Sequence, residues 1–214
     1  MEILTPPDVF SHNRAADFIK DNIDTIRTRN LTDLYYRAIA ADFTANIISA
    51  ISYILIRSGI DNPLKYVNNA VPYGCFAGLA ALDIDIPTHI TEIGPFAYKG
   101  FFGEKIVIPG NVRRIDKLAF NNSKRLKSVT LEEGVEHLDM GVCSQSNELQ
   151  LVVLPNSIKS LGASCFEYCT KLFEVIYNGT IEEYRNVSVG RHCFDKTNVA
   201  YVICKDGEVV VYQE

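Results

Sequence analysis

A repeat of 22 or 23 residues in the second part of the chain constrains its fold more than any other feature. Apolar residues recur with steps of 22, 23 and 23 at three sets of positions. These sets are Ile90, Val112, Val135 and Ile158; Ile93, Ile115, Leu138 and Leu161; and Tyr98, Phe120, Cys143 and Phe166. Independent positions that share one period of this length predict a solenoid of the leucine-rich type.

Each repeat unit begins with a short strand in which alternate residues are apolar. The residues expected to point inward are Ile84 and Ile86, Ile106 and Ile108, Val129 and Leu131, Val152 and Leu154, and Val175 and Tyr177. One such unit cannot bury its apolar face alone, whereas stacked neighbours can. We therefore expect an α+β fold in which about five short-strand repeats form a solenoid.

The repeats also resemble a known family. The strings IPTHITEIGPFAY, IPGNVRRIDKLAF and LPNSIKSLGASCF are similar to BspA-like leucine-rich repeats, and the match covers about residues 82–214. The third repeat departs from the pattern with Val142-Cys143 where Ala-Phe is expected, and the first has Ala97-Tyr98. The resemblance implies a leucine-rich-repeat solenoid. Proteins of this family are often found on cell surfaces.

The chain before the repeats has a helical pattern. A first helix is expected after a cap at Ser11 or Asn13, a second from a cap at Thr32 to Gly59, and a short third from Pro63 to Val67. We interpret residues 1–81 as a helical domain that caps one end of the solenoid, and residues 82–214 as the repeats. At the other end, Tyr201–Cys204 and Val209–Tyr212 flank Asp206-Gly207 and predict a β-hairpin cap.

Charge and hydropathy exclude several partners. The net charge of −5 argues against a nucleic-acid partner, which needs a basic face. The longest apolar run, Ile47–Ile56, is about half of the ~20 residues that span a bilayer, so no membrane insertion is expected. The first residues show no secretory signal, which favours a cytoplasmic or intracellular location.

The residues that commonly carry chemistry form no convincing site. Without an export signal, the six cysteines are expected to be buried free thiols. Cys165 and Cys169 have a spacing that two metal ligands can use, but Cys165 occupies a small buried repeat position. The run from His192 to Asp195 gathers a base, a thiol and a carboxylate, yet adjacent residues seldom point at one another. We therefore expect no catalytic residues, no metal and no cofactor, and the chain is not interpreted as an enzyme.

The most informative candidate site lies on the outward side of the predicted strands. This stripe contains apolar residues where solubility alone would favour polar ones. We take Val107, Thr130, Leu151, Val153 and Ile176 as candidate protein-binding residues. Three other interpretations remain open: short parallel strands favour β-branched residues in any case, the strand register can be shifted by one residue, and the stripe can instead contact the chain's own N-terminal helices.

Two classes of function follow from these patterns. The first is a non-catalytic protein-interaction module that binds a protein partner through the strand face of the solenoid, the helical region or both. The second is a structural subunit of a larger assembly, such as a virion or a multiprotein shell, in which homo-oligomers are expected. An enzyme with an unrecognised site is the third and weakest alternative. A fold alone does not choose among partners.

Overall fold

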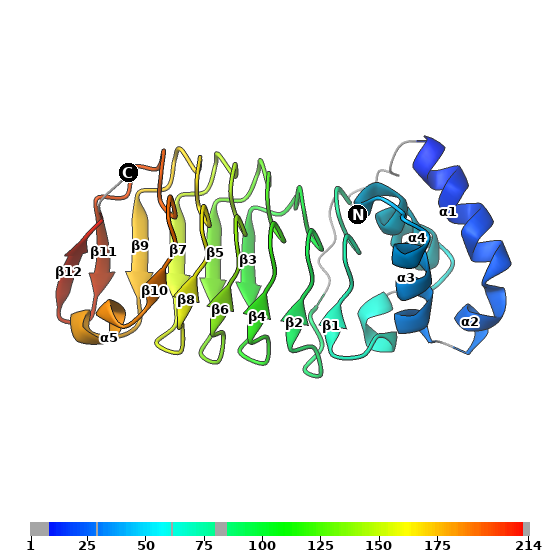
Figure 1. The fold of residues 1–214 in the computed structure, drawn as a ribbon, viewed down its shortest axis with the longest axis horizontal. Helices are drawn as coiled ribbons and strands as arrows, with labels where there is room; N and C mark the ends of the chain where they lie inside the picture. Colours follow the sequence, from blue (N-terminus) through cyan, green and yellow to red (C-terminus); the bar gives the residue numbers. More distant parts are fainter. Residues whose placement is uncertain (1–8, 29, 61, 80–84, 212–214) are drawn as a thin grey trace.

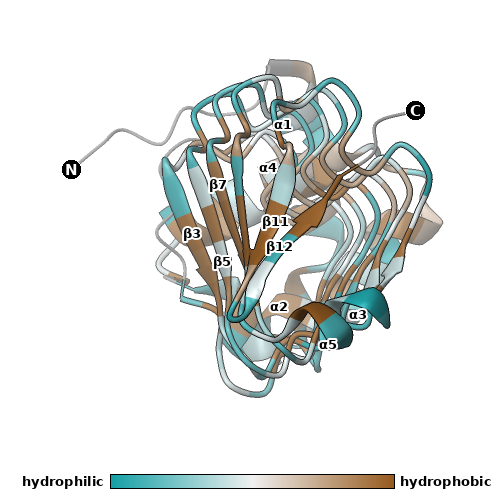
Figure 2. Ribbon diagram, turned by 90° about the vertical axis from the view of Figure 1, so that its left-hand side faces the viewer, coloured by the Kyte–Doolittle hydropathy of each residue, from teal (hydrophilic) through white to brown (hydrophobic). Residues whose placement is uncertain are grey.

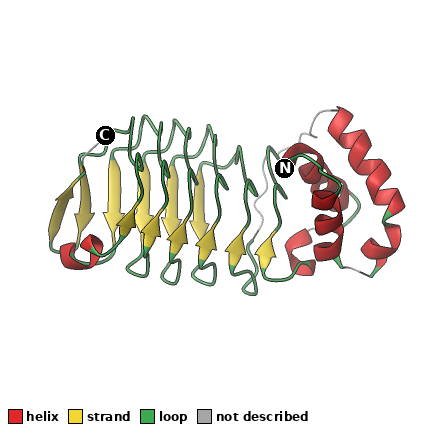
Figure 3. Ribbon diagram, in the orientation of Figure 1, coloured by secondary structure: helices red, strands yellow, loops and turns green. Residues whose placement is uncertain are grey.

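The chain folds into a stack of solenoid turns with a group of helices at its N-terminal end (Figure 1). The structure is a computed structural model that describes residues 9–28, 30–60, 62–79 and 85–211. Most helices gather at one end of the molecule, a short one lies near the other end, and strands follow one another along the stack (Figure 3). The α+β solenoid expected from the repeat period is confirmed.

Five short helical segments precede the solenoid. They are α1 (Val9–Asp21), α2 (Ile23–Arg27), α3 (Leu31–Ala40), α4 (Ala45–Arg57) and the 3₁₀-helix η1 (Pro63–Tyr66). The second helix, expected as one segment from Thr32 to Gly59, is instead divided into α3 and α4. The break is local: Asp42 adopts a left-handed conformation with φ 57°, and Phe43 N–H returns to the carbonyl of Ala38. Aspartate tolerates this conformation better than most residues, so the chain can turn there without glycine.

The cap of α3 also differs from the expectation. Asn30, and not Thr32, is the N-cap, because the Asn30 side chain accepts a hydrogen bond from Asp33 N–H. Thr32 Oγ1 accepts a hydrogen bond from Asn68 N–H at 2.8 Å instead. This bond ties α3 to the segment that leads into the first solenoid strand.

The strands form two sheets that run along the stack. The short sheet contains, in order, β1 (Ala70–Val71), β2 (Glu92–Ile93), β4 (Arg114–Ile115), β6 (His137–Leu138), β8 (Ser160–Leu161) and β10 (Ser188–Val189). The long sheet contains β3 (Lys105–Ile108), β5 (Ser128–Leu131), β7 (Leu151–Leu154), β9 (Glu174–Tyr177), β11 (Tyr201–Cys204) and β12 (Gly207–Val210). All neighbours pair in parallel except β11 and β12, which form the antiparallel hairpin expected at the C-terminal end.

The described part of the solenoid has six turns, against the expected five or so. The additional turn contains β1, which pairs with β2, so the stacking extends to the N-terminal side of residue 82. Of the first expected strand, Ile84 lies outside the described residues and Ile86 is half-buried outside any strand. The last turn is longer than the others because it includes the short helix α5 (Ile181–Arg185). The division into domains at residue 82 stays a prediction.

A tight turn on the third side of the solenoid joins successive layers. Each of these turns has two residues with positive φ, four positions apart. The pairs are Gly74 and Gly78, Phe96 and Gly100, Leu118 and Asn122, Gly141 and Gln145, Ser164 and Tyr168, and His192 and Lys196. Backbone N–H groups of one turn donate to carbonyl groups of the next, as from Phe120 to Val142 at 2.8 Å. These bonds satisfy backbone groups that strand pairing does not reach.

The core lies between the two sheets and the tight turns, and aromatic rings stack inside it. Tyr98 and Phe120 lie parallel with ring centroids 5.1 Å apart, and Phe166 and Phe194 stack at 5.6 Å. Cys143 occupies the intervening position, so the departure seen in the sequence interrupts the stack without exposing it. All six cysteines are buried and free, as expected.

Secondary-structure elements pack against both ends of the solenoid. At the N-terminal end, α4 packs so closely that a Cβ atom added to Gly74 would lie 2.7 Å from Ala45 Cα. At the C-terminal end, the β11–β12 hairpin and α5 lie in front of the stacked turns when the solenoid is viewed along its axis (Figure 2). Ile181 N–H donates to Asp206 Oδ1 at 2.7 Å and fixes α5 to the hairpin turn.

Candidate protein-interaction surface

The outward side of the long sheet carries two rows of side chains, which we call the long-sheet face. The strand register sets both rows. The first row contains Val107, Thr130, Val153, Ile176 and Ile203, and the second contains Lys105, Ser128, Leu151, Glu174, Tyr201 and Val210. Five intervals of about 4.8 Å make the face about 24 Å long, the scale of a protein contact.

All five residues predicted from the sequence lie on this face. Val107 is 56% exposed, and Thr130, Leu151, Val153 and Ile176 are partly buried between their neighbours. The strand residues expected to point inward are buried from β5 to β9, so the predicted register holds there. The N-terminal helices α1 to α4 lie beyond the end of the stack and do not cover this face in the described part of the chain (Figure 1). The binding role of the five residues stays a prediction.

Sequence reasoning missed the continuation of the face onto the hairpin. Tyr201, Ile203 and Val210 are 47%, 37% and 50% exposed and extend the two rows beyond Ile176. The hairpin was interpreted only as an end cap. The alternation of Tyr201 and Ile203 with buried Val202 and Cys204 is the signal that identifies these outward residues.

Charged residues line one side of the face. Lys127 Nζ lies 2.9 Å from Glu104 Oε2, and Lys171 Nζ lies 2.8 Å from Glu148. The hydrogen bond from Lys127 lowers the pKa of Glu104. Arg125 lies over the exposed ring of Phe102, 5.2 Å from its centroid. An apolar centre beside a polar rim is the usual anatomy of a protein interface.

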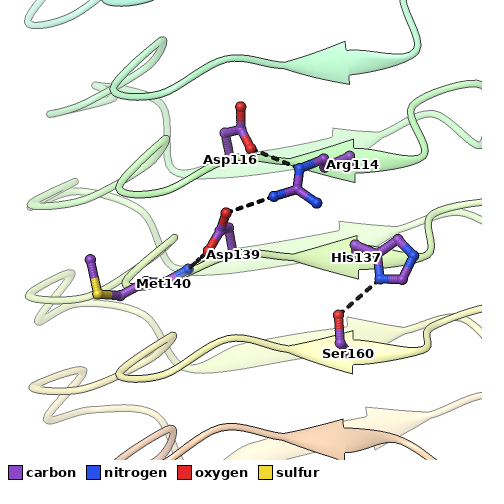
Figure 4. A network of polar contacts seen from close by, with 6 residues as sticks. All are labelled: Arg114, Asp116, His137, Asp139, Met140 and Ser160. Atoms are coloured by element: carbon purple, nitrogen blue, oxygen red, sulfur yellow. Dashed lines mark hydrogen bonds and ion pairs between the residues drawn. The ribbon is translucent and has the colours of Figure 1, made fainter.

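The outward side of the short sheet is polar by comparison (Figure 4). Arg114 forms ion pairs at 2.8 Å with both Asp116 and Asp139, and the hydrogen bond to Asp116 is the main reason that its pKa is raised. His137 Nδ1 lies 2.9 Å from Ser160 Oγ. These groups satisfy one another, so the long-sheet face is the stronger candidate for an apolar contact.

The segment from His192 to Asp195 does not assemble a nucleophilic site. His192 Nδ1 lies 2.9 Å from Asp195 Oδ2, which gives a base and a carboxylate in contact. The intervening thiol of Cys193 is only 3% exposed and points into the core. Burial raises the pKa of the neighbouring Cys165 thiol, and the same cause raises that of Cys169 to about 12. These two buried thiols stay protonated at neutral pH, and a thiol in that state is a poor nucleophile.

Among the described residues, no three His, Cys, Asp or Glu side chains lie together in a way that could hold a metal ion. Within the same residues, no helix combines the length and apolar character that crossing a membrane requires. Cys165 and Cys169 are both buried in the core, where they pack as small apolar groups.

Comparison with known proteins agrees with the geometry of the repeats. The family model described as "BspA type Leucine rich repeat region" matches six copies over residues 69–200. The chain belongs to this family. The six copies agree with the six turns of the structure and begin beside β1, before the first repeat recognised from the sequence. No curated protein is similar enough to count as a relative.

Solved structures of three bacterial proteins are similar to parts of this BspA-type chain. A leucine-rich repeat protein from Eubacterium ventriosum has 21% identity and a TM-score of 0.50, with coverage of 61% of this chain and 41% of that one. The pneumococcal vaccine antigen PcpA has 17% identity and a TM-score of 0.40, with coverage of 66% and 36%. A leucine-rich cell surface protein from Faecalibacterium prausnitzii has 15% identity and a TM-score of 0.32, with coverage of 67% and 51%. The chain thus spans about half or less of each of these proteins, and the first supports the fold alone.

Proposed function

We propose that this BspA-type protein is a non-catalytic interaction module that binds a protein partner through the long-sheet face. The observation that carries the proposal is a series of exposed or partly exposed apolar side chains on this face, which is interrupted by Thr130 and includes Val107, Val153, Ile176, Tyr201, Ile203 and Val210. Contiguous exposed apolar patches are uncommon on monomeric proteins, and where they occur they often mark interaction sites. Leucine-rich-repeat folds commonly serve as interaction or structural scaffolds, which is consistent with this use.

Val153, near the centre of the face, and Ile203, at its hairpin end, are the anchors that we select. Val153 lies between Thr130 and Ile176 in the register, and Ile203 lies next to Ile176. A carboxylate introduced at either position would be desolvated when the partner binds. Central interface residues commonly contribute about 2 kcal/mol or more, which corresponds to a loss of affinity of roughly 30-fold.

The test is an affinity pull-down of the tagged chain from its native source, followed by titration of the recovered partner. We expect Val153→Glu and Ile203→Glu to weaken binding at least about 30-fold. Ser188→Glu, at an exposed position on the short sheet, is the matched control and should bind as the wild type does. Thermal unfolding of each variant checks that the fold is intact. Full binding by both long-sheet variants would refute this face as the contact.

One observation favours the second candidate, a subunit of a larger assembly. Val211 N–H donates to Ala200 O across the hairpin. In an antiparallel pair, successive residues turn their backbone groups alternately toward and away from the partner strand, so the N–H and C=O groups of Glu208 and Val210 point away from β11. In the described part of the chain these groups have no partner, and an open strand edge can pair with another chain. If they join copies, Val210→Pro should shift the mass measured by light scattering from oligomer to monomer. A wild-type monomer at high concentration would refute self-pairing.

A further inference from the structure

A groove lies between α3 and the first turn of the solenoid, at the opposite end from the hairpin. It has a volume of about 260 Å³. Tyr36 and Ile39 of α3 line one side, and Tyr73 and Pro95 line the other. Tyr36 is 66% exposed and Ile39 is 38% exposed, so apolar surface remains open to solvent here. None of these residues belongs to the long-sheet face.

The floor of the groove is an open sheet edge. β1 is the first strand of the short sheet and pairs only with β2. Glu92 N–H donates to Asn69 O, and Gly94 N–H donates to Val71 O. The backbone groups of residues 69 and 71 therefore face β2, and those of the residue between them face the other way. The N–H and C=O of Ala70 therefore point away from β2, and within the described part of the chain neither has a hydrogen-bond partner. A single extended peptide strand supplies both complementary groups at once.

The side chain at the edge leaves room for such a strand. Ala70 occupies the outward position that Glu92 and Arg114 occupy in the next two strands. Ala70 lines the groove, and its methyl group takes up less of the space there than a longer side chain would.

The charge beside the groove is negative. Glu92 and Asp116 both contribute to its lining. Asp116 is paired with Arg114, which is also bound by Asp139, whereas Glu92 has no ion pair in the described part of the chain. The Arg114 guanidinium is therefore already shared between two carboxylates. A basic side chain is the complement that this rim lacks.

We propose that the groove binds an extended segment of a partner protein, which adds to the open edge of β1 as a short strand. A lysine or arginine of that segment pairs with Glu92, and an aromatic or aliphatic side chain packs against Tyr36 and Ile39. The site is separate from the long-sheet face and does not depend on the function proposed for it. Backbone pairing supplies affinity here, and the acidic rim with its tyrosines supplies selectivity.

The experiment begins with a positional library of blocked hexapeptides, in which each position in turn is fixed as one amino acid, screened against the full chain. We expect lysine and arginine to be enriched at one position and aromatic or large aliphatic residues at another. The best peptide is then titrated by fluorescence polarisation against wild type, Glu92→Lys, Tyr36→Ala and Val153→Glu. We expect a loss of affinity of at least tenfold for the first two variants and no change for Val153→Glu.

A second arm tests backbone pairing without changing the protein. Methylating one peptide amide nitrogen at a time removes one donor, and strand addition predicts that alternate positions lose at least tenfold in affinity while their neighbours do not. Three results would overturn the proposal: no basic enrichment in the library, equal binding by Glu92→Lys, or equal tolerance of methylation at every amide. Loss of binding in Val153→Glu alone would place the peptide on the long-sheet face and would also overturn it.

Discussion

Tyr98 provides a sharp test of how the core is stabilised. Its side chain is 3% exposed, and its hydroxyl group has no hydrogen-bond partner in the described part of the chain. An unsatisfied buried hydroxyl costs about 1–3 kcal/mol. Phenylalanine stands at the equivalent repeat positions Phe120 and Phe166, so Tyr98→Phe keeps the stacked ring and removes only the oxygen. We expect the variant to be more stable by about 1 kcal/mol, because the small space left behind offsets part of the gain.

The matched control is the same chemical change at Tyr177. The hydroxyl of Tyr177 donates a hydrogen bond to Asn156 Oδ1 at 2.8 Å. Tyr177→Phe removes this bond and should therefore destabilise the chain by about 1 kcal/mol. Urea unfolding followed by circular dichroism measures both variants, which should move the midpoint in opposite directions with an unchanged slope.

The effect of Tyr98→Phe should also depend on pH. Burial raises the pKa of Tyr98 well above its ordinary value of 10.0. Above pH 10 the unfolded chain therefore releases this proton while the folded chain retains it, so the free energy of unfolding falls as pH rises. Phenylalanine has no such proton, and the advantage of the variant should grow above pH 10. A destabilised variant would show that the hydroxyl is satisfied, and an advantage that is constant with pH would show that the pKa of Tyr98 is not raised by burial.

Three further changes test the cap and the buried thiols. Gly74→Ala should destabilise the chain by more than about 2 kcal/mol in urea unfolding, because φ is +60° and the new methyl group would meet Ala45. The control Gly78→Ala has a similar φ of +67° but open space around the methyl group, so it should cost only about 1 kcal/mol. Equal costs would contradict the close packing of α4. Burial raises the pKa of Cys75 from 9.0 to about 12, so stability should fall as pH rises through that interval, and Cys75→Ala should make the fall shallower in urea titrations. Asn30→Ala should lower stability by about 1 kcal/mol in the same assay, because it removes the cap bond from Asp33 N–H.

The solenoid could be predicted because its period depends on residues that every turn must bury. Ile90, Val112, Val135 and Ile158 are all buried at equivalent places. The first turn was missed, although Cys75-Phe76 stands 22 residues before Ala97-Tyr98 and contributes the same buried pair. No regular strand repeat precedes it, because the chain there is helical. A repeat is recognised because several of its positions recur together. The first turn lacks the long-sheet strand, so only part of the repeat pattern is present there.

Local conformation was harder to predict than the repeat. The apolar residues of α3 and α4 keep the spacing of a single helix across the break, and the left-handed residue Asp42 does not change the hydropathy pattern noticeably. The candidate surface shows the same division. The register of Val107 to Ile176 follows from alternation within the repeats, whereas the addition of Tyr201, Ile203 and Val210 depends on how the hairpin docks on β9. The groove beside β1 depends on the placement of α3, which pairwise spacing in the sequence does not specify.

The hydrogen bonds between successive tight turns give the stack an electrostatic direction. In each of them the N–H group belongs to the earlier turn and the carbonyl to the later one, as from Gly74 to Pro95 and from Phe96 to Lys117. The peptide dipoles on this side therefore add along the axis, with carbonyl oxygens facing the N-terminal end. There α4 presents its own N-terminus, where Ala45 contacts Gly74. The positively polarised first turn of α4 thus lies near the negative end of this side of the stack, and the helix continues across the first solenoid turn to Ser52, which contacts Cys75.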